Sequence, residues 1–490
     1  MSLLNRHSTA AAEIPKLFHI IGGSERAGGS AGTYEHVNPS TGQVQTTVPL
    51  AGAAEVDAAV KAANAAFPGW RGTAPEERRR ILERLAVLIG EHSEQLARLS
   101  ALEFGGAIVF TRHLALLSRQ FTNYYAGWAD RLEGQVATHD EASGFVYTIP
   151  EPLGTVAVIV TWNGPIISLG MKVIPALAAG NTVVLKPAEI APFSSQVFME
   201  LAKEAGVPDG VINLVHGGVE AGTALTGHPG IAKITFTGGP ATAQSILNAA
   251  AHNLTPAVLE LGGKSANLVF PDADLDAASQ HTTLVGLSNA GQGCALPTRV
   301  LVQDSIYDDF LQRLEATVSA LNVGDPLVDE TMVGPVISRA ASERILGIVD
   351  EATSTTSARI VTGGKRLEGE LAGGWFVAPT VLADVDPHSA VAQKEIFGPV
   401  ISVMRFGTEE EAVALANNTG YGLSAYVQSG DAARVRRLVT QLRCGTVGVN
   451  GGAPLTYNAP FGGLGLSGYG KEGGKAGIDE FLHLKTVLVR

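Results

Sequence analysis

Cysteine is nearly absent from this 490-residue chain, which contains only Cys294 and Cys444. Two cysteines cannot build a disulfide framework, and no spacing of Cys and His typical of a metal site occurs, so we expect a reducing compartment and no bound metal. The N-terminal residues also lack the continuous apolar segment of a secretory signal. A cytoplasmic location is therefore the expectation.

Positive charge is scarce as well. The chain has 35 Lys and Arg against 47 Asp and Glu, a net charge of −12. Nucleic acids and anionic membranes both require concentrated Lys and Arg, so we expect neither as a main partner.

A long hydrophobic run is present, but it does not read as a membrane span. Residues 153–185 carry one charge, Lys172, and are numerous enough to cross a bilayer. However, Asn163, Pro165 and Pro175 interrupt the run, and both of its ends are short β-branched stretches. The pattern predicts two buried strands around a helix.

From residue 154 onward, short β-rich runs alternate with helical segments. This alternation is typical of a parallel, doubly wound α/β sheet of the Rossmann type, which binds dinucleotides. We predict an NAD-binding domain over 15–130 and 151–260, of which 53–129 is mainly helical, and an α/β catalytic domain over 261–460.

Two segments, 131–150 and 478–490, fit neither domain. Both contain alternating, strand-like stretches, "SGFVYTIPEP" and "FLHLKTVLVR". We expect them to form a small β arm that adds to a neighbouring subunit, which would make the protein a homodimer or a homotetramer.

The stretch "SNAGQGCALPTRV", residues 288–300, places Cys294 in a loop between a predicted helix and a predicted strand. Gly291 and Gly293 would let backbone and substrate approach the thiol closely. Local sequence leaves two readings open, a nucleophile or a small buried side chain. Cys444, at the edge of a strand, is expected to be structural.

Two polar residues follow apolar strands. Glu260 ends the strand in "LELGGKS", where burial should raise its pKa, and it could serve as a general base or belong to a buried ion pair. Asn163 in "TWNGP" could donate to a developing oxyanion, or it could simply form a turn.

The GxGxxG loop that binds pyrophosphate in many dinucleotide folds is missing after the first strand. Instead, "FTGGPATA" sets Gly238 and Gly239 before a helix start, where backbone N–H groups can face a phosphate or merely form a turn. Lys186 and Glu189 in "KPAE" follow the second strand, where a ribose usually lies, although surface residues at a helix start are the alternative. A Glu at this place would favour NAD over NADP.

Several motifs together carry a family resemblance. "TWNGP", "KPAE", "FTGG", "LELGGKS", "GQGC" and "KEIFGPV" occur in the order found in the aldehyde dehydrogenase superfamily, and "PFGGLGLSGYGKEGG" resembles its closing motif. The resemblance extends from about Gly32 to the C-terminus. The separation of Glu260 and Cys294, 34 residues, is also similar to the family's.

The resemblance implies a role for each matching residue. Cys294 would be the nucleophile, Glu260 the general base, and Asn163 with the backbone N–H of Cys294 the oxyanion hole. Lys186 and Glu189 would hold the adenosine ribose, Gly239 would lie near the pyrophosphate, and Glu395 and Phe397 would position the nicotinamide ribose and ring. The implied cofactor-binding residues are Thr161, Trp162, Lys186, Glu189, Gly222, Gly238, Gly239, Leu261, Glu395 and Phe397, and those of the substrate tunnel are Gly164, Met171, Gly293, Leu455 and Phe461.

The expected reaction is the NAD-dependent oxidation of an aldehyde to a carboxylic acid through a thiohemiacetal and a thioester on Cys294. Gly164 stands where the family often has a bulky residue, and Gly293 is small, so we expect a wide tunnel for a bulky apolar or aromatic aldehyde. The alternatives are a semialdehyde dehydrogenase that uses NAD or NADP and, from another class, a cofactor-free cysteine hydrolase acting on esters.

Overall fold

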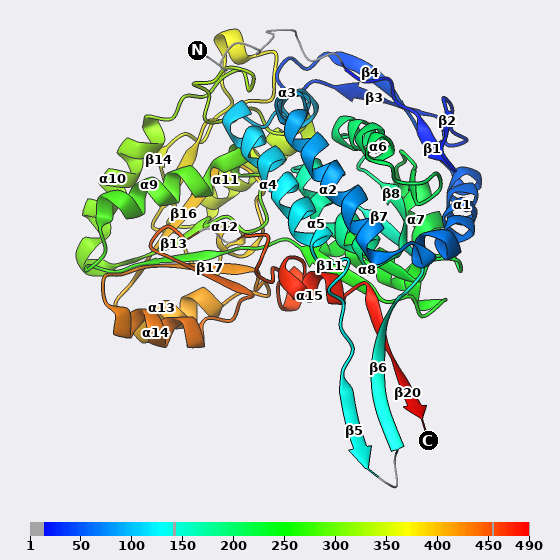
Figure 1. Ribbon diagram of the computed structural model, residues 1–490. Helices are drawn as coiled ribbons and strands as arrows, with labels where there is room; N and C mark the ends of the chain where they lie inside the picture. Colours follow the sequence, from blue (N-terminus) through cyan, green and yellow to red (C-terminus); the bar gives the residue numbers. More distant parts are fainter. Residues whose placement is uncertain (1–13, 141–143, 453–454, 490) are drawn as a thin grey trace, which may run out of the picture.

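The computed structural model describes residues 14–140, 144–452 and 455–489. Two α/β bodies lie side by side, and a ribbon of strands projects away from them (Figure 1). The predicted doubly wound α/β fold with an additional β arm is confirmed.

The first body is built on an eight-stranded sheet whose central strands are parallel. Its β7 and β8 are buried along their whole length, as the hydrophobic run predicted. In spatial order, the strands are β19 (Gly468–Tyr469), β11 (Ala257–Leu261), β10 (Lys233–Gly238), β7 (Thr155–Ile159), β8 (Thr182–Lys186), β9 (Ile212–Leu214), β1 (His19–Ile21) and β2 (Ser24–Arg26).

Helices cover both faces of this sheet. The interior helix is α5 (Pro165–Ala178), which is apolar and buried all round because further helices lie outside it. The helices on its side are α2 (Pro75–Glu91), α3 (Ser93–Phe104), α4 (Ile108–Ala126) and α6 (Phe193–Ala205), and those on the other side are α1 (Ala53–Gly72), α7 (Val219–Thr226) and α8 (Pro240–Ala251).

The second body contains a seven-stranded sheet that is parallel except at one edge strand. The strands, in spatial order, are β14 (Arg359–Thr362), β15 (Thr380–Ala383), β16 (Val400–Phe406), β13 (Arg299–Gln303), β12 (Ala266–Val269), β17 (Ser424–Gln428) and β18 (Thr446–Val449). On one face lie α9 (Leu275–Gly286) and α10 (Tyr307–Ser319), and on the other α11 (Arg339–Thr355), α12 (Ala390–Gln393), α13 (Glu409–Asn417) and α14 (Ala432–Gln441).

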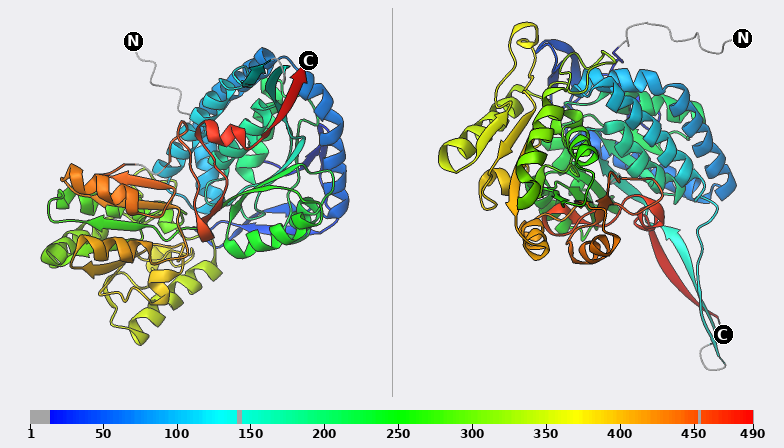
Figure 2. Two further views of the ribbon diagram at one scale, coloured as in Figure 1. Left: turned by 90° about the horizontal axis from the view of Figure 1, so that it is seen from below. Right: turned by 90° about the vertical axis from the view of Figure 1, so that its left-hand side faces the viewer.

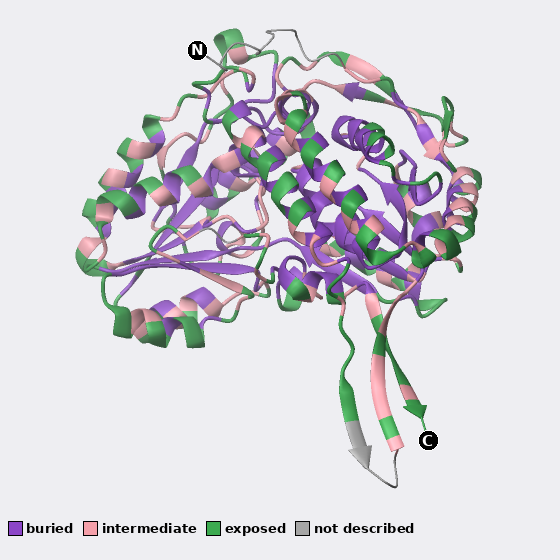
Figure 3. Cartoon of the chain, viewed as in Figure 1, coloured by how far each residue is buried: buried purple, intermediate pink, exposed green. Residues whose placement is uncertain are grey.

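The projecting ribbon is a three-stranded antiparallel sheet of β5 (Val136–Asp140), β6 (Gly144–Pro152) and β20 (Leu482–Val489) (Figure 2). Unlike the central strands of the two bodies, β6 and β20 are exposed or half-buried along their length (Figure 3). Leu484 and Leu488 are 65% and 69% exposed. The arm therefore presents apolar side chains that this chain alone does not cover.

The chain returns to the first body before it enters the arm. Residues 461–477, which the sequence assigned to no domain, include β19 and most of α15 (Gly474–Asp479). Strand β19 pairs antiparallel with β11, so that Gly468 lies opposite Glu260. The domain boundaries given above stay a prediction.

A two-stranded sheet, β3 (Thr33–Val37) and β4 (Val44–Pro49), completes the N-terminal part. Among the residues that the structure describes, no helix combines the length and the hydropathy that crossing a membrane would require.

Candidate active site

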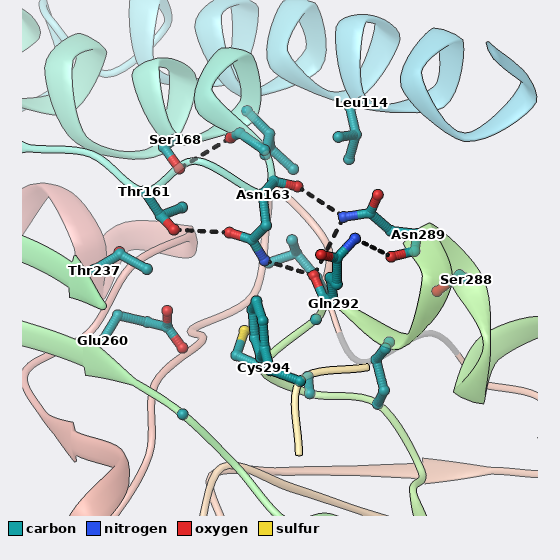
Figure 4. Close-up of a pocket in the computed structure, with 18 of the residues that line it drawn as sticks. Leu114, Thr161, Asn163, Ser168, Thr237, Glu260, Ser288, Asn289, Gln292 and Cys294 are labelled. Atoms are coloured by element: carbon teal, nitrogen blue, oxygen red, sulfur yellow. Dashed lines mark hydrogen bonds between the residues drawn. The ribbon is translucent and has the colours of Figure 1, made fainter. Parts of the chain in front are cut away.

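A cavity of about 580 Å³ is lined by residues at the carboxyl ends of strands of the first sheet and by residues of the second body. Asn163 follows β7, Thr237 lies on β10, Glu260 lies near the end of β11, and all three line this cavity together with Cys294 (Figure 4). The structure thus brings together the three residues that the sequence proposed for catalysis.

The loop of Cys294 has an unusual backbone. Its short 3-10 segment η1 (Ser288–Gly291) contains Asn289, Ala290 and Gly291 at positive φ values of 50°, 53° and 71°. Non-glycine residues rarely adopt this conformation, so the loop stores strain that surrounding contacts must offset.

Gly291 allows the close backbone approach that was expected of it, but it does not border the cavity. A Cβ atom on Gly291 would lie 2.0 Å from the carbonyl oxygen of Gly398, and Gly291 does not line the cavity. Gly291 therefore lets the backbone of the Cys294 loop pack against the backbone at Gly398. The residues that follow it, Gln292 to Cys294, are the ones that line the cavity. Gly293 does line the cavity, as expected.

Side-chain amides hold the strained loop in place. Asn289 Nδ2 donates to the carbonyl oxygens of Asn163 and Gln292, both at 3.2 Å. Gln292 Nε2 donates to Asn289 O at 3.0 Å, and its Oε1 accepts from the backbone N–H of Ile337 at 2.8 Å. These bonds connect the Cys294 loop to the end of β7 and to the second body (Figure 4).

Asn163 is oriented from both ends of its amide. Its Oδ1 accepts from the Thr161 hydroxyl at 2.8 Å, and its Nδ2 donates one hydrogen to Gln292 O at 2.8 Å. Among the described residues, none accepts a hydrogen bond from the second Nδ2 hydrogen, and Asn163 and Cys294 line the same cavity (Figure 4). A fixed donor of this kind can stabilise an oxyanion next to the sulfur.

Glu260 is almost fully buried, at 4% exposure, and burial raises its pKa to about 8. The nearby carboxylate of Glu472 raises it further, whereas Lys172 and the Cys294 thiol lower it. The carboxyl of Glu260 points toward the Cys294 sulfur (Figure 4), and its Oε1 has no hydrogen-bond partner. Glu260 can therefore exchange a proton near neutral pH.

Cys294 is half-buried, and its pKa is raised well above the ordinary value of a thiol. Burial is the main cause, followed by the negative charges of Glu260 and Glu395. The sulfur is therefore a thiol at rest, and a thiolate requires transfer of its proton to a base.

The sequence did not single out the ion pair behind Glu260. Lys172, 1% exposed, is paired with Glu472 and also donates to Thr235 Oγ1 at 3.0 Å. A lone Lys in an otherwise apolar segment is the signal that could have found it, because a buried ammonium requires a counter-charge. Its partner lies 300 residues further along the chain.

Around the rest of the cavity lie six of the expected cofactor-binding residues besides Thr161. The rings of Trp162 and Phe397 meet edge to face at 5.4 Å. Glu395 Oε1 accepts from the backbone N–H of Gly263 at 3.0 Å, and burial raises the pKa of this carboxyl to about 7. The six are Trp162, Gly238, Gly239, Leu261, Glu395 and Phe397.

The remaining three, Lys186, Glu189 and Gly222, lie apart from the cavity, around the ends of β8 and α7. Lys186 Nζ is buried and donates to the carbonyl of its neighbour Pro187 at 3.1 Å. Burial lowers the pKa of Lys186, and the carboxylate of Glu189 partly reverses this. A Cβ on Gly222 would lie 3.7 Å from Lys186 Cε, so these residues form one cluster.

The five expected tunnel residues all line the cavity, which is mainly apolar. Helix α4, which lies in the segment predicted to be mainly helical, contributes Phe110, Leu114 and Leu117. No Lys or Arg occurs among the described residues of the lining. Within the part of the chain that the structure describes, no group of three His, Cys, Asp or Glu could hold a metal ion.

Cys444 lies outside this cavity. Its thiol donates to the carbonyl oxygen of Thr446 at 3.2 Å, and burial raises its pKa to about 11. This arrangement agrees with a structural role.

Comparisons with known proteins agree with the site. A sequence model of the Aldehyde dehydrogenase family matches residues 26–487. An aldehyde dehydrogenase of Alternaria alternata is 40% identical over 462 residues, 94% of this chain and 92% of that protein. The mitochondrial succinate-semialdehyde dehydrogenase of Arabidopsis thaliana is 40% identical, covering 92% of this chain and 85% of that protein.

Comparison with solved structures leads to the same family. The crystal structure of betaine aldehyde dehydrogenase from Staphylococcus aureus in complex with NAD⁺ superimposes with a TM-score of 0.94 at 35% identity, covering 98% of this chain and 95% of that one. These matches extend over nearly the whole chain and confirm the resemblance seen in its motifs. The chain belongs to the aldehyde dehydrogenase family.

Proposed function

We propose that the protein oxidises an aldehyde to a carboxylic acid with NAD, using Cys294 as the nucleophile. The observation that carries this proposal is the position of the Cys294 sulfur, which shares one apolar cavity with the Glu260 carboxyl and the Asn163 amide. A nucleophile, a base and an oxyanion donor in one cavity are what acyl chemistry on a thiol requires.

The residues around this cavity fit NAD. Gly239 precedes α8, which begins at Pro240, and a Cβ on Gly239 would meet nothing within 4 Å, so there is space for a phosphate at this helix start. Glu395, Phe397 and Trp162 would hold the nicotinamide end, and Lys186 and Glu189 the adenosine ribose. When bound, NAD supplies the two-electron acceptor of the oxidation. Glu189 would disfavour the 2′-phosphate of NADP.

In the first half of the reaction, the carboxylate of Glu260 takes the proton of the Cys294 thiol. The sulfur then attacks the aldehyde carbon and forms a thiohemiacetal. Its oxyanion lies within reach of the free N–H of Asn163 and of the Cys294 backbone N–H. Because Thr161 and Gln292 already orient Asn163, little rearrangement is needed at that moment.

In the second half, oxidation leaves a thioester on Cys294. Glu260 first releases the proton that it took from the thiol to solvent, and as a carboxylate it then takes a proton from water. The hydroxide attacks the thioester, the sulfur leaves as a thiolate and regains a proton from Glu260, and the carboxylic acid is released. A base with a pKa of about 8 is matched to this step near neutral pH.

The side chains that line the cavity favour a bulky apolar or aromatic aldehyde as the substrate. Leu114, Leu117, Met171 and Phe461 line it, and its described residues include no cation that would pair with a carboxylate. The second candidate is a semialdehyde, which the name of the Arabidopsis relative favours.

We also propose that the protein forms a homodimer or homotetramer through the arm of β5, β6 and β20. The exposed Leu484 and Leu488 are the kind of surface that a second subunit would cover. The cytoplasmic location stays a prediction.

A panel of aldehydes assayed for NADH and NADPH formation tests the function. Aromatic and long-chain aldehydes should be oxidised with NAD at higher kcat/KM than succinic semialdehyde, and NADP should be a poor substitute. A strong preference for succinic semialdehyde would select the second candidate instead. Ester cleavage without any nicotinamide cofactor, and no aldehyde oxidation, would show a cysteine hydrolase.

A further inference from the structure

Asn289 belongs to the strained loop that precedes Cys294, and the mechanism above gives it no role. Its side chain is almost fully buried, at 3% exposure, and its φ of 50° is one that asparagine adopts more readily than most residues. Its amide lies beside Asn163 and Gln292 (Figure 4). Asn289 is therefore placed where the proposed oxyanion donor meets the loop of the nucleophile.

The amide of Asn289 has one possible orientation. Its neighbours are the backbone carbonyl oxygens of Asn163 and Gln292, each 3.2 Å from Nδ2. A carbonyl oxygen can only accept a hydrogen bond, so the NH2 group must face both, with one hydrogen for each. The Oδ1 atom has no hydrogen-bond partner among the described residues. Asn289 thus uses both of its donor hydrogens to bridge two segments of backbone.

One of the two carbonyls also orients the side chain of Asn163. Gln292 O accepts from Asn163 Nδ2 at 2.8 Å as well as from Asn289 Nδ2, so two donors converge on one oxygen. A carbonyl oxygen has two lone pairs, and both are engaged here. The position of Gln292 O therefore decides where the Asn163 amide lies.

The peptide that carries this carbonyl has little else to stop it from turning. It joins Gln292 to Gly293, and a glycine has no Cβ to restrict the dihedral angles on its side. Because the peptide is planar, a turn that moves its carbonyl also moves its N–H and the backbone that leads to Cys294. Asn289 opposes such a turn, since its other hydrogen bond fixes it to Asn163 O, on the segment that follows β7.

We propose that Asn289 is a positioning residue of the oxyanion hole. By holding Gln292 O, it keeps the Asn163 amide where its free N–H can reach the oxyanion on the carbon bound to Cys294. The effect of Asn289 is then on the rate of the first oxidation and not on the binding of NAD. This inference rests on the proposed function, in which Asn163 stabilises the thiohemiacetal oxyanion.

A double-mutant cycle tests whether Asn289 acts through Asn163. The four enzymes are the wild type, Asn163→Ala, Asn289→Gly and the double variant. Glycine adopts a φ of 50° without strain, so Asn289→Gly removes the two donors while the loop keeps its conformation. The measured quantity is the rate of the pre-steady-state burst of NADH with benzaldehyde and NAD. Quenching of tryptophan fluorescence gives the Kd of each enzyme for NAD.

Asn163→Ala should slow the burst by about 10²–10³-fold, the usual cost of losing one oxyanion donor. Asn289→Gly should slow it by about 10- to 100-fold, the cost of a misplaced group in an active site. The double variant should be slower than Asn163→Ala by no more than about threefold, because there is no longer an amide to position. The Kd for NAD should be the same in all four enzymes.

Asn450→Gly is the matched control. Asn450 also has a positive φ, 47°, its Nδ2 donates to the carbonyl oxygen of Ser429 at 2.9 Å, and it is not among the residues that line the cavity. This variant should retain the wild-type burst rate. An equal loss of rate in Asn450→Gly and Asn289→Gly would contradict a role specific to the oxyanion hole.

Losses that multiply in the double variant would overturn the proposal, because Asn289 would then act independently of Asn163. A wild-type burst in Asn289→Asp would also overturn it, since an ionised carboxylate preserves the shape of the side chain but cannot donate. If Asn289→Gly does not fold, the same cycle with Asn289→Asp decides in its place. Absence of NADH formation by the wild type with every aldehyde would instead overturn the proposed function itself.

Discussion

The two cysteines of this chain lie in loops of similar burial but opposite character. Cys294 and Cys444 are both half-buried, and burial raises the pKa of both thiols. Neither sulfur is a thiolate at rest. The usual signature of a reactive cysteine, a lowered pKa, therefore does not separate them.

What separates them is the group that faces each sulfur. The Cys444 thiol donates to the carbonyl of Thr446, which cannot take a proton away. The Cys294 thiol faces the carboxyl of Glu260, whose pKa of about 8 allows it to accept that proton, and both border an open cavity. In the proposed function, the reactivity of Cys294 comes from the neighbouring carboxyl and from access to the cavity.

The largest expected effect is a difference in activity between the alanine variants of the two cysteines. Cys294→Ala should reduce NADH formation by at least about 10⁴-fold, because no other group in the cavity can form the covalent intermediate. Cys444→Ala should retain turnover, with a loss of about 1 kcal/mol in the free energy of unfolding. Steady-state kinetics and urea unfolding measure the two effects. Equal losses of activity would contradict the assignment.

The second effect concerns the base that makes Cys294 different. Glu260→Gln should slow thioester hydrolysis by about 10³-fold and also slow the first oxidation, because the amide can take a proton neither from water nor from the Cys294 thiol. In the wild type, this step should accelerate as pH rises through about 8, since Glu260 acts only when ionised. Pre-steady-state bursts of NADH recorded at several pH values separate hydrolysis from oxidation. A wild-type pH profile in the variant would remove Glu260 from this role.

Much of the fold could be predicted from sequence because each buried parallel strand is a short β-branched run between helices. The strands over residues 155–159 and 182–186 follow this rule. The exposed strands of the arm could be predicted from a different pattern, the alternating stretches that fit neither domain. The two-residue strand Gly468–Tyr469 could not be predicted. It exists because its backbone pairs with β11, which no local pattern encodes.

The candidate site also contains residues that could be predicted from the sequence and residues that could not. Glu260 and Asn163 could be predicted because each comes at or just after the end of a buried strand. The pairing of Lys172 with Glu472 joins residues 300 positions apart, so no local spacing indicates it. The contact of Gly291 with Gly398 was also missed, because it depends on how the second body folds against the loop.

A smaller effect tests the strained loop that presents Cys294. Gly291→Ala should lower the free energy of unfolding by about 2 kcal/mol and reduce activity, since φ is 71° and the new Cβ would lie 2.0 Å from Gly398 O. Gly347→Ala, within α11 with nothing inside 4 Å, is the matched control and should stabilise by about 0.5–1 kcal/mol. Unchanged stability of Gly291→Ala would mean that the loop can relax without cost.

The smallest expected effect concerns the charges that set the pKa of Glu260. Glu472→Gln removes a carboxylate that raises the pKa of Glu260 but preserves the shape of the side chain, so the pH midpoint of thioester hydrolysis should move down by about one unit. Glu480→Gln is the control, because Glu480 pairs with Lys233 at 2.9 Å and does not contribute to the pKa of Glu260. If the midpoint moves equally in both variants, general destabilisation of the C-terminal segment causes the shift. If it moves only in Glu472→Gln, the buried pair of Lys172 and Glu472 adjusts the pKa of Glu260, although Glu472 is distant from Glu260 in sequence.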